Sequence, residues 1–140
     1  MVNRNTYYFC KSTYLRIKNK KAVDIIICKN KPTPELFFIE VKYHKNSHGR
    51  LGFGSGKGVG FQPEILSKKP EYFEKNLRWI LFYEDSDKIF FLTNEKIRNH
   101  ISKDVIGEKF NNIRKKLFKE EKGLTENELI VELKSWLIPD

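Results

Sequence analysis

The chain has 140 residues, 39% of them hydrophobic, which is enough for one domain with one apolar core and excludes gross disorder. With 27 Lys and Arg against 18 Asp and Glu, its net charge of +9 favours a polyanionic partner. The apolar runs are too short to cross a bilayer and the start lacks a signal-peptide pattern, so we expect one cytoplasmic domain over residues 1–140 with no membrane contact.

Strand patterns dominate the first half of the chain. Residues 22–28 form a β-branched apolar run with one acid, Asp24, inside it, and residues 36–44 form a second apolar run. Two prolines in the segment 30–34 block continued strand pairing and predict a turn. We therefore expect the two runs to form a β-hairpin. Residues 14–18 alternate apolar and basic side chains, which predicts a further, half-exposed strand.

The second half mixes strands with helices. Prolines that suit a first helical turn indicate a broken helical segment over residues 63–76. Strands are predicted over 79–83 and 89–92, and helices over most of 94–138. In that C-terminal region, apolar residues at near-helical spacing predict a helix over 104–121.

Two local signals separate the C-terminal helices. Gly123 is expected to end the first of them, and the pattern Thr125-Glu126-Asn127-Glu128 is typical of a capping box that begins the last. Trp136 lies on that last helix and could either join a dimer interface or pack on the sheet of its own chain.

The chemically informative residues lie in the predicted hairpin. Side chains at i and i+2 of a strand share a face, so Glu40 and Lys42 project together, about 6.6 Å apart along the strand. The apolar residues of this strand face the other way, toward the expected core: Phe37, Ile39, Val41 and Tyr43. Charged groups in such an apolar strand are costly unless they are paired or bind a metal. Asp24 interrupts the neighbouring strand, and the hairpin can bring its carboxylate beside that of Glu40.

Two adjacent carboxylates repel each other, and a divalent cation removes that repulsion. Mg²⁺ prefers hard oxygen ligands and takes one or two carboxylates together with water and substrate phosphate. A lysine beside the metal can orient the attacking water or stabilise charge on the phosphate. Asp24, Glu40 and Lys42 therefore predict a centre for phosphodiester hydrolysis. The Glu-x-Lys pattern alone indicates no more than a surface ion pair; the hypothesis depends on the whole set of strands, turn, acids and basic charge.

The spacing Asp24, fifteen residues, Glu40-Val41-Lys42 resembles the motif of the PD-(D/E)xK nuclease superfamily, which includes restriction endonucleases, junction resolvases and repair nucleases. The resemblance is specific over the hairpin, residues 22–44. It implies an α/β (α+β) fold, in which a mixed central sheet carries flanking helices. It also implies that Asp24, Glu40 and the backbone carbonyl of Val41 are metal ligands, and that Lys42 is the catalytic lysine.

Two features depart from the family pattern. Val23 replaces the proline that precedes the first acid in the motif. Many members also carry another acid on a helix before the hairpin, whereas this chain has no acid before Asp24. Either that ligand is dispensable here or the N-terminal helix of the fold is missing or reduced.

A glycine-rich loop, residues 45–62, follows the hairpin. It fails the phosphate-binding P-loop pattern, because Leu51 and Gly58 stand where a glycine and a Ser or Thr are needed. Its position beside the predicted centre favours contacts to phosphates and base edges, although a passive surface loop is the alternative. The expected DNA-binding residues are Lys45, Asn46, His48, Arg50, Lys57 and Gln62. His44 and His48 are weaker candidates for a general base.

The resemblance and the basic charge together predict a metal-dependent endodeoxyribonuclease, most like a type II restriction enzyme, that acts on double-stranded DNA as a homodimer. The expected cofactor is Mg²⁺, for which Mn²⁺ can substitute. The alternatives are a structure-specific nuclease, such as a Holliday-junction resolvase or repair nuclease, and a non-catalytic DNA-binding module with the same fold.

Overall fold

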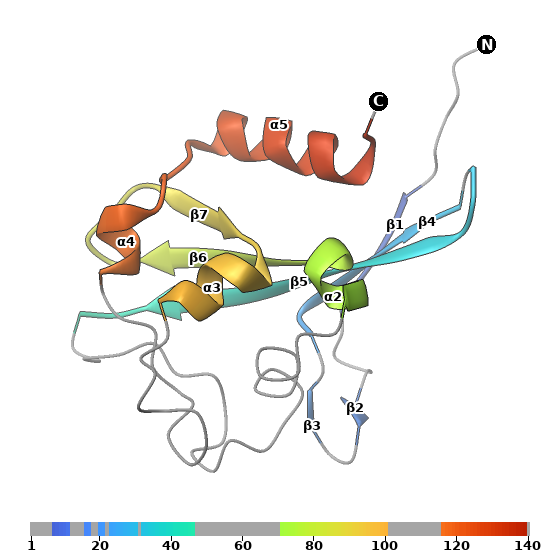
Figure 1. Ribbon diagram of the computed structural model, residues 1–140, viewed down its shortest axis with the longest axis horizontal. Coiled ribbons are helices and arrows are strands. Elements are labelled where there is room, and N and C mark those ends of the chain that lie inside the picture. The colour runs from blue at the N-terminus through green and yellow to red at the C-terminus, as the bar shows by residue number, and fades with distance from the viewer. Residues whose placement is uncertain are drawn as a thin grey trace.

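Figure 1 shows the computed structural model of the chain. It describes residues 7–11, 16–17, 20–21, 23–30, 32–46, 71–100 and 116–139. The predicted glycine-rich loop beyond Asn46 and most of the predicted helix at 104–121 lie outside the described residues.

The described part of the chain is built on a five-stranded mixed sheet of order β1-β4-β5-β6-β7. Its strands are β1 (Tyr7–Lys11), β4 (Ile25–Lys29), β5 (Glu35–His44), β6 (Leu77–Tyr83) and β7 (Ile89–Leu92). All neighbours pair antiparallel except β5 and β6, which are parallel. The parallel pair requires a crossover, and α2 (Glu71–Asn76) belongs to that connection.

The predicted hairpin is confirmed as β4 and β5, which pair antiparallel around a bend at Pro32 and Thr33. One detail of the prediction was wrong. Asp24 lies immediately before β4 and not inside it, because the paired ladder begins at Ile25.

The strands of the N-terminal region were only partly predicted. β1 was not predicted, although its sequence Tyr-Tyr-Phe-Cys consists of residues favoured in strands and could have indicated it. β2 (Arg16–Ile17) and β3 (Lys20–Lys21) form a separate two-stranded ribbon, and β2 lies within the strand predicted at 14–18.

Helices cover both faces of the sheet, which gives three layers (Figure 1). On one face, α2, α3 (Asn94–Asn99) and α4 (Leu117–Glu120) pack over a core that includes Trp79, Leu81 and Ile97. On the other face, α5 (Glu126–Leu137) packs over a core that includes Phe37 and Ile39. Because helices cover both faces, the strands largely lack the alternation of apolar and polar residues that is typical of a sheet with one solvent-exposed face.

The apolar face of β5 was only partly predicted. Phe37, Ile39 and Val41 do pack in the core beneath α5. Tyr43 does not: it is 56% exposed, although His44, the next and last residue of the strand, is buried on the opposite face.

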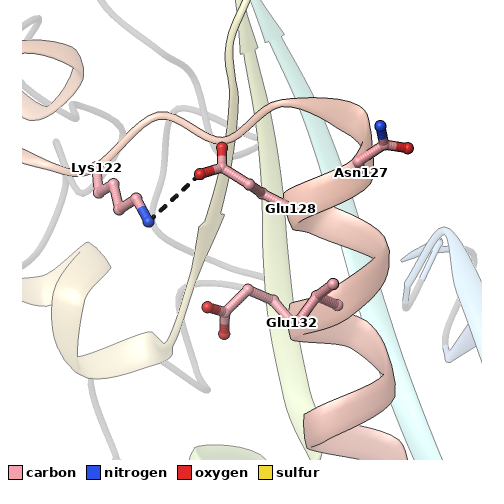
Figure 2. Close-up of a pocket in the computed structure, with 5 residues that line it drawn as sticks. Lys122, Asn127, Glu128 and Glu132 are labelled. Carbon is pink, nitrogen blue, oxygen red and sulfur yellow. Dashed lines mark ion pairs between the residues drawn. The ribbon is translucent and has the colours of Figure 1, made fainter.

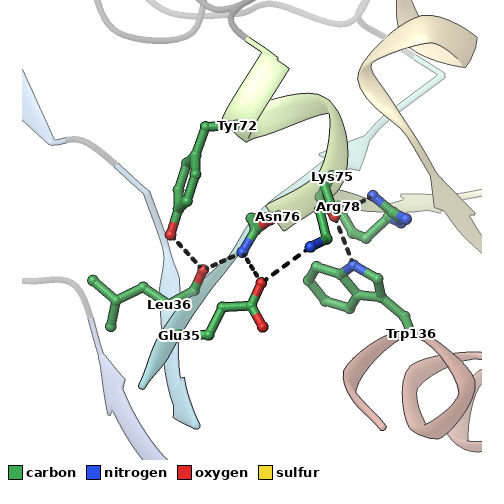
Figure 3. A network of polar contacts seen from close by, with 7 residues as sticks. All are labelled: Glu35, Leu36, Tyr72, Lys75, Asn76, Arg78 and Trp136. Carbon is green, nitrogen blue, oxygen red and sulfur yellow. Dashed lines mark hydrogen bonds and ion pairs between the residues drawn. The ribbon is translucent and has the colours of Figure 1, made fainter. Parts of the chain in front are cut away.

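The joint between α2 and β5 is polar (Figure 3). The buried amide of Asn76 donates from Nδ2 to the Leu36 carbonyl at 2.8 Å and to Glu35 Oε1 at 3.1 Å. The Tyr72 hydroxyl donates to the same carbonyl at 3.0 Å. These bonds satisfy an otherwise costly buried amide and hold the helix against the start of β5.

Trp136 joins α5 to the same region (Figure 3). Its Nε1 donates to the Lys75 carbonyl at 2.9 Å, and its ring meets Phe37 edge-on at 5.1 Å. The guanidinium of Arg78 lies 4.9 Å from the same ring, and its partial burial, opposed by nearby Glu74, lowers the Arg78 pKa. Trp136 therefore packs on its own sheet, as one of the two sequence-based alternatives proposed.

The C-terminal helix confirms its predicted start. The Thr125 side chain accepts from the Glu128 backbone amide at 3.2 Å, and Glu128 Oε2 accepts from the Thr125 amide at 2.8 Å, which completes the capping box. The preceding helix, α4, ends at Glu120, close to the predicted end at 121, and its C-cap is Glu121, two residues before Gly123. None of the helices among the described residues is long and apolar enough to cross a membrane.

Candidate functional site

The predicted site residues lie in one row across the sheet. Ile25 pairs with Ile39, so Asp24, one position before the ladder, stands opposite Glu40. Directly opposed residues of an antiparallel pair point to the same face, with Cβ atoms about 5 Å apart. In the next strand Glu40 is level with Trp79. The hairpin thus places the two acids on the face of the sheet that α2, α3 and α4 cover.

Glu40 is a buried carboxylate, only 3% exposed. Lys42 Nζ lies 2.9 Å from Glu40 Oε1, as the shared strand face predicts. A buried carboxylate is expensive without a compensating cation, and the Lys42 side chain, 21% exposed, supplies one while still reaching the surface. The ion pair with Lys42 therefore offsets the cost of burying the Glu40 carboxylate in an otherwise apolar strand.

Asp24 is anchored to the same strand. Its Oδ2 accepts a hydrogen bond of 2.8 Å from the Val41 backbone N–H, and the bond is partly buried. This bond continues the contact between the two strands beyond the last ladder pair. A carboxylate has about four acceptor positions, and the bond from the Val41 amide occupies one of those of Asp24.

The residue that neighbours Glu40 on β6, Trp79, was not predicted to lie beside the site. Trp79 is fully buried, and its Nε1 donates to Asn94 Oδ1 at 2.5 Å. Asn94 is also fully buried, at the start of α3. This bond fixes an indole beside Glu40 in the row of paired residues. The sequence signal was weak. A tryptophan in a strand indicates that the residue packs in the core, but it does not indicate which strand will lie beside it.

His44 continues the face that carries Glu40 and Lys42, but it is embedded among aromatic rings. Its side chain is 2% exposed, and its ring lies 5.5 Å from that of Tyr83 and 5.7 Å from that of Phe118. These contacts favour a packing role for His44 over a role as a general base, for which the sequence made it only a weak candidate.

The two described residues of the predicted DNA-binding set follow β5. Lys45 is exposed. Asn46 is held at its backbone N–H by Glu84 Oε2, at 2.7 Å, and at Oδ1 by the Tyr83 hydroxyl, at 2.8 Å. Desolvation, together with a hydrogen bond to Asp85, raises the Tyr83 pKa, so the hydroxyl remains a donor at neutral pH. His48, Arg50, Lys57 and Gln62 lie outside the described residues.

The metal ligands implied by the resemblance are two carboxylates and the backbone carbonyl of Val41. Among the described residues, no group of three or more His, Cys, Asp or Glu side chains is arranged to hold a metal ion. Asp24 and Glu40 are hard oxygen donors at facing positions, which suits Mg²⁺, since that ion takes one or two carboxylates and completes its shell with water and phosphate. The donor set fits Mg²⁺ and lacks the nitrogen and sulfur ligands typical of zinc.

A pocket of 310 Å³ lies elsewhere, at the N-terminal half of α5 (Figure 2). Lys122, Asn127, Glu128, Val131 and Glu132 line it, and Lys122 and Glu128 form an ion pair at 3.6 Å. It shares no residue with the hairpin site, and α5 covers the opposite face of the sheet. We assign it no part in the chemistry of Glu40.

Comparison of the chain with protein-family models, with curated proteins and with solved structures found no match. A function can therefore be inferred only from the geometry of the site itself.

Proposed function

We propose that the chain is a Mg²⁺-dependent DNA endonuclease of the restriction-endonuclease-like fold. One observation carries the proposal: Asp24 and Glu40 occupy facing positions of adjacent strands, and Lys42 Nζ lies 2.9 Å from the second acid. Each element of the sequence motif thus falls on one face of one hairpin. A type II restriction enzyme is the preferred subclass, because the small size of the chain, its polar glycine-rich insertion after β5 and its additional C-terminal helices suit an enzyme that reads a sequence.

The arrangement of the fold supports the same proposal. The hairpin lies at the centre of a mixed sheet with helices on both faces, which is the architecture that the resemblance implies. The agreement concerns general architecture, and one architecture can host many functions, so the function is inferred from the site residues.

The chemistry divides among three side chains. Asp24 and Glu40 would hold the metal, with the Val41 carbonyl as a further ligand by resemblance. The metal would lower the pKa of water and neutralise charge on the phosphate. Lys42 reaches the surface from the same strand face, so its ammonium can donate to a phosphate oxygen or orient the water whose oxygen bonds to phosphorus as the bond to one ester oxygen breaks. One such site cuts one strand, so cleavage of both strands requires a homodimer.

A non-catalytic DNA-binding module is the second candidate. The observation that favours it is that both acids already have partners within the protein, Lys42 for Glu40 and the Val41 amide for Asp24. Such a module would bind DNA and leave it uncut when Mg²⁺ is present. A structure-specific nuclease would instead cut branched DNA and spare linear duplex.

The decisive experiment compares wild type with Asp24→Asn and Glu40→Gln on supercoiled plasmid, with Mg²⁺ and with EDTA. We expect wild type to cut only with Mg²⁺, and both variants to lose at least about 100-fold in rate, because each replaces an anionic ligand with a neutral one. Uncut plasmid with wild type, or normal cleavage by either variant, would contradict the proposal.

The amide variants also control for folding. The asparagine side chain in Asp24→Asn keeps an oxygen that can accept from the Val41 amide, so this variant should unfold close to wild type. Asp24→Ala loses that acceptor and should be less stable by about 1–3 kcal/mol. Thermal unfolding of both variants measures this difference. A loss of cleavage in Asp24→Asn without a loss of stability would be due to the missing metal ligand and not to the missing strand contact.

A further inference from the structure

A short basic ribbon precedes the hairpin that carries the candidate site. β2 and β3 pair antiparallel as a two-stranded sheet of their own, separate from the five-stranded sheet. Over residues 16–21 the sequence is Arg-Ile-Lys-Asn-Lys-Lys, with four basic residues and no acid. Figure 1 shows the ribbon on the side of the sheet away from α5. That is the side on which α2, α3 and α4 pack over the Glu40 face.

The register of the ribbon sets like charges against each other. Arg16 is paired with Lys21, and Ile17 is paired with Lys20. Like charges at directly opposed positions of an antiparallel pair repel, which weakens the pairing of the strands. A two-stranded ribbon is also only marginally stable by itself. The register therefore favours a partner that supplies negative charge to both strands at once.

The charge pattern indicates which partner fits the ribbon. A cluster of Lys and Arg without an acid is typical of segments that bind nucleic acid. Duplex DNA carries one negative charge per about 1.7 Å of its axis, so a row of phosphates offers an anion to each basic residue. A membrane surface fits less well, because Ile17 is the one apolar residue in this segment and gives the lipid no apolar face.

Chain connectivity ties the ribbon to the candidate site. Lys21 and Asp24 are three residues apart, and an extended chain spans at most about 3.6 Å per residue, so their Cα atoms lie within about 11 Å of each other. Each strand of DNA rises about 3.4 Å per nucleotide, so this distance corresponds to about three base pairs. A phosphate bound by the ribbon would thus lie a few base pairs from a phosphate held at Asp24.

We propose that β2 and β3 form a DNA-binding ribbon that contacts backbone phosphates of a duplex, a few base pairs from the bond to be cut. The juxtaposition that carries the proposal is Arg16 opposite Lys21, with Lys21 three residues before Asp24. Bound phosphates offset the repulsion within this pair, so DNA stabilises the ribbon. The position of the ribbon relative to the cut rests on the proposed function, whereas its affinity for phosphates does not.

Fluorescence anisotropy with a labelled duplex in EDTA tests the contact without cleavage. The double variant Arg16→Gln/Lys21→Gln should reduce the slope of log affinity against log salt by about two units, and the affinity at about 100 mM salt by at least about 10-fold. The matched control is Lys122→Gln/Lys134→Gln, which removes two exposed charges before and on α5 and should keep the wild-type slope. A wild-type slope in the ribbon variant, or an equal loss in both double variants, would overturn the proposal.

The variant Arg16→Glu separates DNA binding from formation of the ribbon. It sets opposite charges at the facing positions, which favours the strand pairing, and it adds a negative charge that repels phosphate. Its DNA affinity should fall further than that of Arg16→Gln, while its Tm should be at least that of wild type. DNA affinity equal to wild type would overturn the proposal, as would an Arg16→Glu variant that loses binding to phosphatidylglycerol vesicles and keeps its DNA affinity.

Failure of the ribbon and failure of the nuclease proposal give different results. If wild type leaves plasmid uncut with Mg²⁺ but the ribbon variants lose DNA affinity in EDTA, the nuclease proposal fails and the ribbon stands. If wild type cuts and the ribbon variants bind and cut equally well, the ribbon proposal fails alone. Where both hold, Arg16→Gln/Lys21→Gln should raise the KM for plasmid by about 10-fold or more and keep kcat within about 2-fold.

Discussion

Lys42 has two opposite electrostatic effects at the candidate site: it neutralises the carboxylate of Glu40, and it repels a metal cation that binds the same carboxylate. Without a metal, Lys42 neutralises a carboxylate that is 5% exposed on its side chain. A metal ion that approaches the same oxygen meets the positive charge of the lysine. Lys42 therefore stabilises the protein without metal and competes with the metal that the proposed chemistry requires.

The variant Lys42→Met makes this competition measurable. It should lose plasmid cleavage and bind Mg²⁺ about 3- to 10-fold more tightly than wild type, because a nearby like charge has been removed. Titration calorimetry with Mg²⁺ measures the affinity. Lys45→Met is the matched control, since Lys45 is exposed three residues further on and should leave Mg²⁺ affinity unchanged. Weaker Mg²⁺ binding in Lys42→Met would show that the lysine supports the metal site.

At the scale of elements, the segment between α4 and α5 depends on close packing at Gly123. A Cβ added there would lie 2.6 Å from Lys88 Cβ and 3.0 Å from Lys88 Cγ. The neighbouring Leu124 exchanges two backbone hydrogen bonds with Ile89, of 2.8 and 2.9 Å, and so docks the segment on β7. Glycine is needed because the backbone passes directly over Lys88, whose Cβ cannot move aside.

Gly123→Ala should therefore lower the free energy of unfolding by about 1–3 kcal/mol, through displacement of the segment that leads into α5. Denaturant unfolding measures this loss. Ser135→Ala, at an exposed position of α5, should change stability little and serves as the control. An unchanged stability in Gly123→Ala would mean that the segment moves freely away from β7.

At the scale of the whole molecule, the charge of +9 predicts how DNA binding should respond to salt. Lysine and arginine contacts to phosphate release condensed counterions, so affinity should fall by at least about 100-fold between roughly 50 and 200 mM salt. Fluorescence anisotropy with a labelled duplex measures this slope. A flat response would contradict an interface driven by phosphate contacts.

A pair of lysine variants locates the interface on the molecule. Lys45 is exposed directly after β5, so Lys45→Gln should reduce the salt slope by about one unit. Lys134 is exposed on α5, which covers the face of the sheet opposite to Glu40, and Lys134→Gln should leave the slope unchanged. The reverse pattern would place DNA on the α5 face and separate DNA binding from the Glu40 site.

The parts of the fold that local chemistry dictates were predictable. The prolines after β4, the β-branched run before them and the capping box at Thr125 each act through neighbouring residues, so each left a signal in the sequence. The shared face of Glu40 and Lys42 follows from strand geometry alone, and their ion pair confirms it. Tyr43 failed as a core residue because burial near a strand end depends on what covers that end, which the strand pattern does not encode.

The sequence by itself determined the hairpin, the residues that share its faces and a basic charge suited to a polyanion, because these depend on covalent order, strand periodicity and composition. Only the tertiary structure decided that Asp24 bonds to the Val41 amide, that Trp79 lies beside Glu40 and bonds to Asn94, and that His100 contacts Glu121 at the end of α4. These hydrogen bonds join residues that are 15 to 21 positions apart in the chain. Their physical reason is packing: the parallel pairing of β5 with β6 brings the indole of Trp79 beside Glu40, and the helices packed over that face meet through side chains that no local pattern relates.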